Sequence, residues 1–143
     1  MEFLSDKRLP PQMAIRRFKR AIELLEAAKD MDSTSSAHED TLFTCYLNIA
    51  KAYLGANTPE LARPHLDNAL EMRPNDVQLV YRLGCYYASR KQFEEAVQQF
   101  RSLLQRKPHN RSAQQMLTKC EQARRQQAIQ ERQLCRMMFK TGL

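Results

Sequence analysis

The sequence predicts an all-α chain, a superhelix of stacked antiparallel helix pairs with a long C-terminal capping helix. Composition is the first reason: 143 residues contain only three glycines and no tryptophan, and good helix formers dominate. The second is a proline-terminated pattern of apolar and small residues that recurs after 34 residues. A period of this length, with small residues where two helices cross, is typical of helical-hairpin repeats.

The pattern pairs each residue of one run with a counterpart in the next. The first run is Tyr46, Ile49, Ala50, Tyr53, Ala62, Leu66, Ala69 and Pro74, and the second is Val80, Leu83, Gly84, Tyr87, Ala96, Phe100, Leu103 and Pro108. An earlier partial copy is Ala14, Phe18 and Ala21. We therefore predict one domain over residues 1–143 with these parts: a partial first repeat at 1–30, a loop at 31–38, a second repeat at 43–76, a third repeat at 77–110, and a capping and extended helix at 111–140.

Prolines and polar residues delimit the first three helices. Pro10 and Pro11 suit a helix start, where a missing N–H costs nothing, and helical spacing of apolar residues continues to about residue 29. A polar run containing His38 predicts a loop before a helix at about 39–54. Thr58 is the expected N-cap of the third helix, which runs to about residue 72. Pro64 should kink or loosen its first turns, because proline removes a backbone hydrogen bond.

The later helices follow the same rules. Asn75 or Asp76 should cap a helix over about 76–90, whose partner spans about 92–106. A final helix extends to about Phe139, and its part beyond Ala123 is expected to project from the domain. Its residues expected to close the open end of the stack are Ala113, Met116, Leu117 and Cys120.

Composition also excludes several classes of function. The four cysteines are far apart and form no CxxC pair, so we expect small buried thiols rather than a disulfide framework or a metal site. The histidines share no ligand spacing, the glycines are isolated, and no side chain orients the serines near His38. We therefore predict no cofactor, no metal and no catalysis. No apolar run approaches the roughly 20 residues of a membrane helix, which favours a soluble cytoplasmic or nuclear protein.

The repeat pattern is the signature of tetratricopeptide repeats, a family of binding modules that hold peptides in a groove. The segments 47–54 (LNIAKAYL) and 81–84 (YRLG), and the ending 131–140 (ERQLCRMMFK), resemble the C-terminal region of large immunophilins, which are FK506-binding peptidyl-prolyl isomerase co-chaperones. The resemblance covers almost the whole chain. Any isomerase activity would belong to a domain absent from this chain.

The resemblance implies an adaptor that grips the acidic C-terminal peptide of heat shock protein 90 (or 70) in its concave groove. Asn48 matches the groove asparagine of the family's second repeat, and Arg82 the arginine of its third. Gln78 stands where the family has lysine, and this change should weaken binding by about 1–3 kcal/mol. Lys51 and Lys119 also project towards the concave side and could supply the missing charge. The family's first-repeat lysine and asparagine would fall at or before Met1.

Other interpretations remain open at this stage. Asn48 could bond a neighbouring helix, Arg82 could pair with Asp76 or Glu71, and both lysines could be solvated. The chain carries a formal net charge of +7, and from Lys119 onward six basic residues face two acidic ones. The segment Lys119–Lys140 could therefore bind calmodulin or a client protein. Nucleic acid is a weaker alternative, because the segment has at least as many glutamines as arginines and no known recognition motif.

Overall fold

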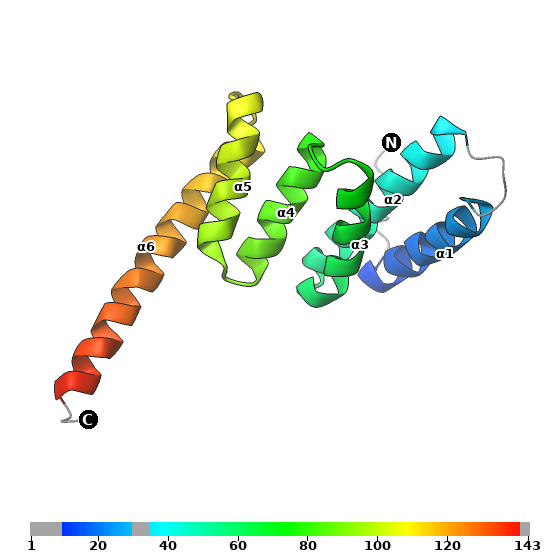
Figure 1. The fold of residues 1–143 in the computed structure, drawn as a ribbon. Helices are drawn as coiled ribbons and strands as arrows, with labels where there is room; N and C mark the ends of the chain where they lie inside the picture. Colours follow the sequence, from blue (N-terminus) through cyan, green and yellow to red (C-terminus); the bar gives the residue numbers. More distant parts are fainter. Residues whose placement is uncertain (1–9, 30–34, 141–143) are drawn as a thin grey trace, which may run out of the picture. The chain divides into compact units, whose positions relative to one another are not determined.

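The computed structural model describes residues 10–29 and 35–140, which form six α-helices and contain no β-strand (Figure 1). The all-α prediction is thereby confirmed. The chain divides into two compact units, Met1–Arg82 and Leu83–Leu143. Residues 1–9 and 30 of the predicted partial repeat, residues 31–34 of the predicted loop, and the family's first-repeat clamp positions lie outside the described residues. The predicted repeat boundaries stay a prediction.

The first unit is built around α2. Helices α1 (Pro11–Lys29) and α3 (Pro59–Met72) both pack against α2 (Ser36–Gly55). Because it has neighbours on two sides, α2 buries seven side chains: Leu42, Phe43, Tyr46, Leu47, Ile49, Ala50 and Tyr53. A helix that is apolar on several faces is expected in such a central position.

One predicted helix start is corrected, and one predicted N-cap lacks its side-chain hydrogen bond. The second helix begins at Ser36 rather than near residue 39, because the Ser35 hydroxyl accepts the His38 backbone N–H at 3.3 Å and caps it. His38 therefore lies in the first helical turn and not in a loop. Thr58 is the N-cap residue of α3, as predicted, but its side chain makes no cap bond. Its hydroxyl instead donates to the Tyr53 carbonyl at 3.0 Å, and Pro64 lies inside the continuous helix α3.

The two turns that contain Asn57 and Lys91 have the same backbone conformation, in keeping with the 34-residue repeat of the sequence. Asn57 and Lys91, 34 positions apart, both adopt the left-handed region, with φ of 60° and 61°. The following residue in each turn donates its backbone N–H to a tyrosine carbonyl: Thr58 to Tyr53 and Gln92 to Tyr87, both at 2.9 Å. The two hairpins thus share their backbone hydrogen bonding as well as their apolar spacing.

Helix α4 (Val77–Ser89) begins in the first unit and ends in the second. Asp76 is its N-cap, as predicted, because its Oδ1 accepts the backbone N–H groups of Gln78 at 2.9 Å and Leu79 at 3.1 Å. In the second unit, α5 (Phe93–Arg106) packs against α6 (Arg111–Lys140). Two ion pairs join these helices, Arg101–Glu121 at 3.6 Å and Arg124–Glu94 at 3.0 Å.

Helix α6 has a packed half and an exposed half. Ala113 and Cys120 are buried as predicted, whereas Met116 and Leu117 are half-buried. The ion pair Arg124–Glu94 lies near the start of α5, so the packed half of α6 ends at about Arg124. Every residue from 129 to 140 is exposed, which fits the expectation that this end projects. The expectation of buried thiols is wrong for Cys135, which lies in this exposed half.

His65 is expected to make the stability of the first unit dependent on pH. Its ring stacks on Tyr53, with 5.9 Å between centroids, and its Nδ1 is buried without a partner among the described residues. Burial lowers its pKa from 6.5; the charge of Glu26 opposes this effect and that of Lys19 adds to it. Below about pH 6.5 the unfolded chain binds more protons than the folded chain at this site, so stability should fall as the pH falls.

We therefore expect urea unfolding to show a loss of stability between about pH 7.5 and 5.5 that is smaller in His65→Phe. His109→Phe, at an exposed position next to α6, is the matched control and should keep the loss of the unaltered chain. An undiminished loss in His65→Phe would assign the pH dependence to other groups.

Candidate functional site

Two of the predicted site residues share one face of α2. Asn48 and Lys51 are three positions apart, so their side chains leave the helix on the same side. Asn48 is half-buried and Lys51 is exposed. This combination places an amide at the helix surface beside a solvated ammonium group. Both are donors that a carboxylate can accept from.

The other pair lies on α4. Gln78 and Arg82 are four residues apart and project from the same face. Gln78 is exposed, while its backbone N–H is held by the Asp76 cap at 2.9 Å. Arg82 is half-buried, and its Cζ lies 5.3 Å from the centroid of the Tyr81 ring. Contact with an aromatic face restrains the guanidinium and keeps its N–H edge available.

The alternative ion pairs for Arg82 are not formed. The carboxylate of Asp76 caps α4 instead, and among the described residues no carboxylate lies within the 4.0 Å ion-pair limit of Arg82. Its charge is therefore not neutralised within the part of the chain that the structure describes. The fifth predicted residue, Lys119, is exposed on α6 and belongs to the second unit.

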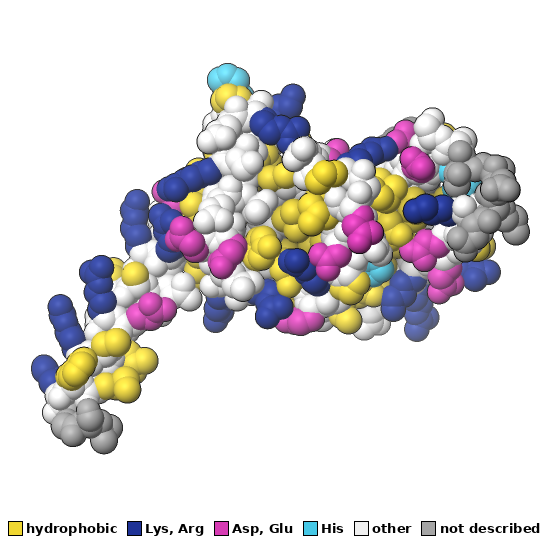
Figure 2. All heavy atoms as spheres, viewed as in Figure 1, with side chains coloured by type: hydrophobic (Ala, Val, Ile, Leu, Met, Phe, Trp, Pro, Cys, Tyr) yellow, Lys and Arg dark blue, Asp and Glu magenta, His cyan; other side chains and the backbone are white. Residues whose placement is uncertain are grey.

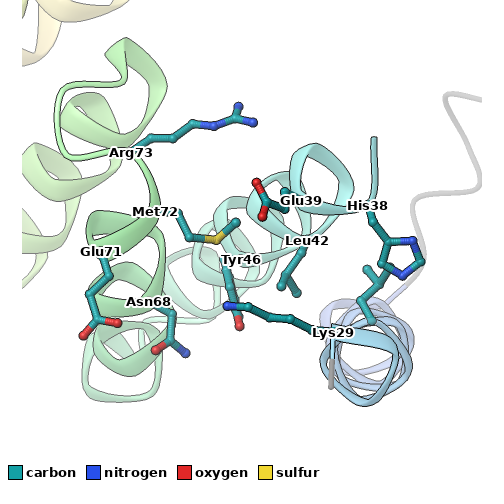
Figure 3. Close-up of a pocket in the computed structure, with 10 residues that line it drawn as sticks. Lys29, His38, Glu39, Leu42, Tyr46, Asn68, Glu71, Met72 and Arg73 are labelled. Atoms are coloured by element: carbon teal, nitrogen blue, oxygen red, sulfur yellow. The ribbon is translucent and has the colours of Figure 1, made fainter. Parts of the chain in front are cut away.

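The structure also contains a cavity that the sequence pattern did not predict. It has a volume of about 400 Å³ and lies where the end of α1, the start of α2 and the end of α3 meet (Figure 3). None of the five predicted site residues lines it. Its lining comes from three segments that are separate in sequence and follow no common spacing, so no signal in the sequence could have located it.

Comparison with known proteins agrees with the repeat pattern and the hairpin geometry. Residues 47–111 match the tetratricopeptide repeat family. Residues 47–111 therefore resemble tetratricopeptide repeats. Over 130 residues the chain is also similar to peptidyl-prolyl cis-trans isomerase FKBP4 of Homo sapiens, with 26% identity. These residues are 90% of this chain and 28% of that protein. The Bos taurus FKBP4 is 25% identical over the same lengths.

The predicted resemblance to the repeat region of large immunophilins is thus confirmed. The chain spans about 28% of the length of these curated relatives. Repeats of this family form extended concave binding surfaces along their helices. Within the described ranges, no helix is long and apolar enough to cross a membrane, and no group of three or more His, Cys, Asp or Glu side chains could hold a metal ion.

Proposed function

We propose that this chain is a non-catalytic, cytoplasmic co-chaperone-type adaptor that binds the acidic C-terminal peptide of a chaperone such as heat shock protein 90. The observation that carries the proposal is Arg82, a restrained guanidinium without a carboxylate partner among the described residues. Similarity to FKBP4 over 90% of the chain supports an immunophilin-type adaptor.

The proposed contacts follow from the chemistry of a C-terminal aspartate. Its two carboxylates need cations and amide donors from neighbouring helices. We assign the side-chain amide of Asn48 to the terminal carboxylate and Arg82 to a carboxylate of the peptide. Lys51 supplies a further charge at the same face of α2. Gln78 donates as a neutral amide, which is weaker than a cation at this position.

The test is calorimetric titration with a peptide ending in Met-Glu-Glu-Val-Asp and with its C-terminally amidated form. We expect binding that amidation abolishes and that Arg82→Ala weakens by about tenfold or more, the effect of losing a hydrogen bond to a charged group of about 1.5–3 kcal/mol. Gln78→Lys should tighten binding by about tenfold. Arg111→Ala, which removes an exposed cation from α6, is the control and should leave the affinity unchanged.

Two results would contradict the proposed site. Equal affinity for the free and amidated peptides would remove the role of the terminal carboxylate. Binding that survives Arg82→Ala but disappears when residues 125–140 are deleted would transfer the function to the C-terminal half of α6.

That second result would favour the alternative function, a scaffold for calmodulin or a client protein. Its supporting observation is the exposed end of α6, where basic and apolar side chains lie together (Figure 2). The exposed apolar residues there are Ile129, Leu134, Met137, Met138 and Phe139, at 46%, 60%, 64%, 54% and 83%. Arg132, Arg136 and Lys140 are interleaved with them, a combination that suits an acidic partner with an apolar groove.

A further inference from the structure

The cavity in the first unit combines an apolar wall with polar groups. Leu25 of α1, Leu42 of α2 and Met72 of α3 supply the apolar part. His38 and Glu39 come from the first turn of α2, and Asn68 and Glu71 from the last turns of α3 (Figure 3). A volume of about 400 Å³ is within the range of pockets that hold small ligands or single side chains.

The cavity is separate from the candidate groove. Glu39 and Asn48 are nine residues apart on α2, as are Leu42 and Lys51. Nine residues are about two and a half helical turns, so the two members of each pair leave α2 on opposite sides. An occupant of the cavity would therefore not compete with a peptide held by Asn48 and Lys51.

One of the two cations that line the cavity is already engaged. Arg73 forms an ion pair with Asp40, and its Cζ lies 4.8 Å from the centroid of the Phe43 ring. Its charge is therefore balanced by a neighbour. Lys29, the last residue of α1, is the remaining cation of the lining.

The carboxylates at the cavity carry more negative charge than Lys29 carries positive charge. Neither Glu39 nor Glu71 has a cation within 4.0 Å among the described residues. A third carboxylate, Glu26, accepts a hydrogen bond of 2.6 Å from the hydroxyl of the lining residue Tyr46. The cavity is therefore acidic, although the chain as a whole has a formal net charge of +7.

The lining also offers acceptors. The Nε2 atom of His38 is buried and has no hydrogen-bond partner among the described residues. In the neutral imidazole a ring nitrogen of this kind can accept a hydrogen bond. The carboxylates of Glu39 and Glu71 accept only, and the side-chain amide of Asn68 can accept as well. An occupant with several N–H donors and a positive charge would satisfy these groups.

From this arrangement we propose that the cavity is a second binding site, which takes the side chain of an arginine from a partner peptide. The aliphatic stem lies against Leu25, Leu42 and Met72, as such stems do on apolar surfaces. The guanidinium, whose planar fork carries five donors, is attracted by the carboxylates of Glu39 and Glu71 and donates to acceptors on one side of the cavity. Lys29 at the same cavity opposes the ligand's charge and weakens its binding.

The test is a nuclear magnetic resonance titration of the full ¹⁵N-labelled chain with N-acetyl-arginine-N-methylamide. We expect amide shifts at the end of α1, the start of α2 and the end of α3. N-acetyl-citrulline-N-methylamide has the same shape without the charge and should bind at least about tenfold more weakly. Glu39→Gln with Glu71→Gln should weaken arginine binding by about tenfold or more, and Lys29→Gln should strengthen it. Arg82→Ala should leave it unchanged, so failure here is distinguishable from failure of the groove.

Three results would overturn the proposal. The first is an absence of shifts at these helix ends up to about 20 mM ligand, which excludes even millimolar affinity. The second is equal binding of the arginine and citrulline compounds. The third is tighter binding of N-acetyl-glutamate-N-methylamide, together with weaker binding in Lys29→Gln, which would make the cavity an anion site. Glu60→Gln with Asp67→Asn, at exposed positions of α3 outside the lining, is the matched control for loss of acidic charge.

Discussion

Replacing Phe100 by alanine is expected to lower the free energy of unfolding by about 3–5 kcal/mol. Phe100 has 0% exposure and is the largest of the fully buried side chains. Removing its ring loses the transfer free energy of the ring and leaves a cavity between α4 and α5 that rigid neighbours fill only in part. Since domains of this size are stable by only about 5–15 kcal/mol, urea unfolding followed by circular dichroism should detect the change easily.

Phe139→Ala is the matched control for this substitution. It removes the same ring from a helix, but Phe139 is 83% exposed. We expect its effect to stay within about 0.5 kcal/mol. If the two variants lost similar stability, the ring of Phe100 would not be part of a packed core, and the assignment of repeat positions to the core would fail.

The core was predictable because it depends on spacing. Ala96, Phe100 and Leu103 stand 34 positions after Ala62, Leu66 and Ala69, and all six are buried. Each repeat must bury the same helix face against its neighbours, so a periodic pattern in the sequence becomes a periodic core. The helix ends that rest on a single cap, such as Asp76, were also predictable.

Features that depend on local competition were predicted less well. Thr58 has the residue type and position of an N-cap, but its hydroxyl bonds to the Tyr53 carbonyl of the preceding helix. Ser35 starts α2 earlier than the polar composition of that segment indicated. Cys135 was expected to be buried like Cys120, yet α5 begins at Phe93 beside Arg124 and does not reach that part of α6. In each case the outcome depends on which neighbouring group lies closest.

Part of the candidate site was also predictable from repeat positions, and part was not. Asn48, Lys51, Gln78 and Arg82 were selected by their positions in the repeats. Helical spacing puts Asn48 and Lys51 on one face of α2, and Gln78 and Arg82 on one face of α4. The contact of Arg82 with Tyr81 was not part of that selection. The cavity was missed because the ends of three helices create it: Lys29, His38 and Glu71 have no common period. Such a site exists only after the helices have packed.

Gly84→Ala is expected to destabilise the second unit by about 1–3 kcal/mol, although alanine is the better helix former. A Cβ at Gly84 would lie 2.6, 2.7 and 2.9 Å from Cζ, Cε1 and Cε2 of Phe100. These distances are far below van der Waals contact, and the ring is fully buried, so it has little room to move. The intrinsic helix preference for alanine, about 0.5–1 kcal/mol, is therefore smaller than the packing penalty.

Two comparisons make this prediction specific. Gly55→Ala places a Cβ where no other atom lies within 4 Å, so we expect no loss and a gain of up to about 1 kcal/mol from the less flexible unfolded chain. In the Phe100→Ala background the clashing ring is gone, and Gly84→Ala should then cost little or become stabilising. A double-mutant cycle measured by urea unfolding should give a coupling of about 1–3 kcal/mol between the two positions. Strict additivity would mean that Gly84 is not selected by contact with Phe100, and that the close helix crossing of the third repeat tolerates a larger side chain.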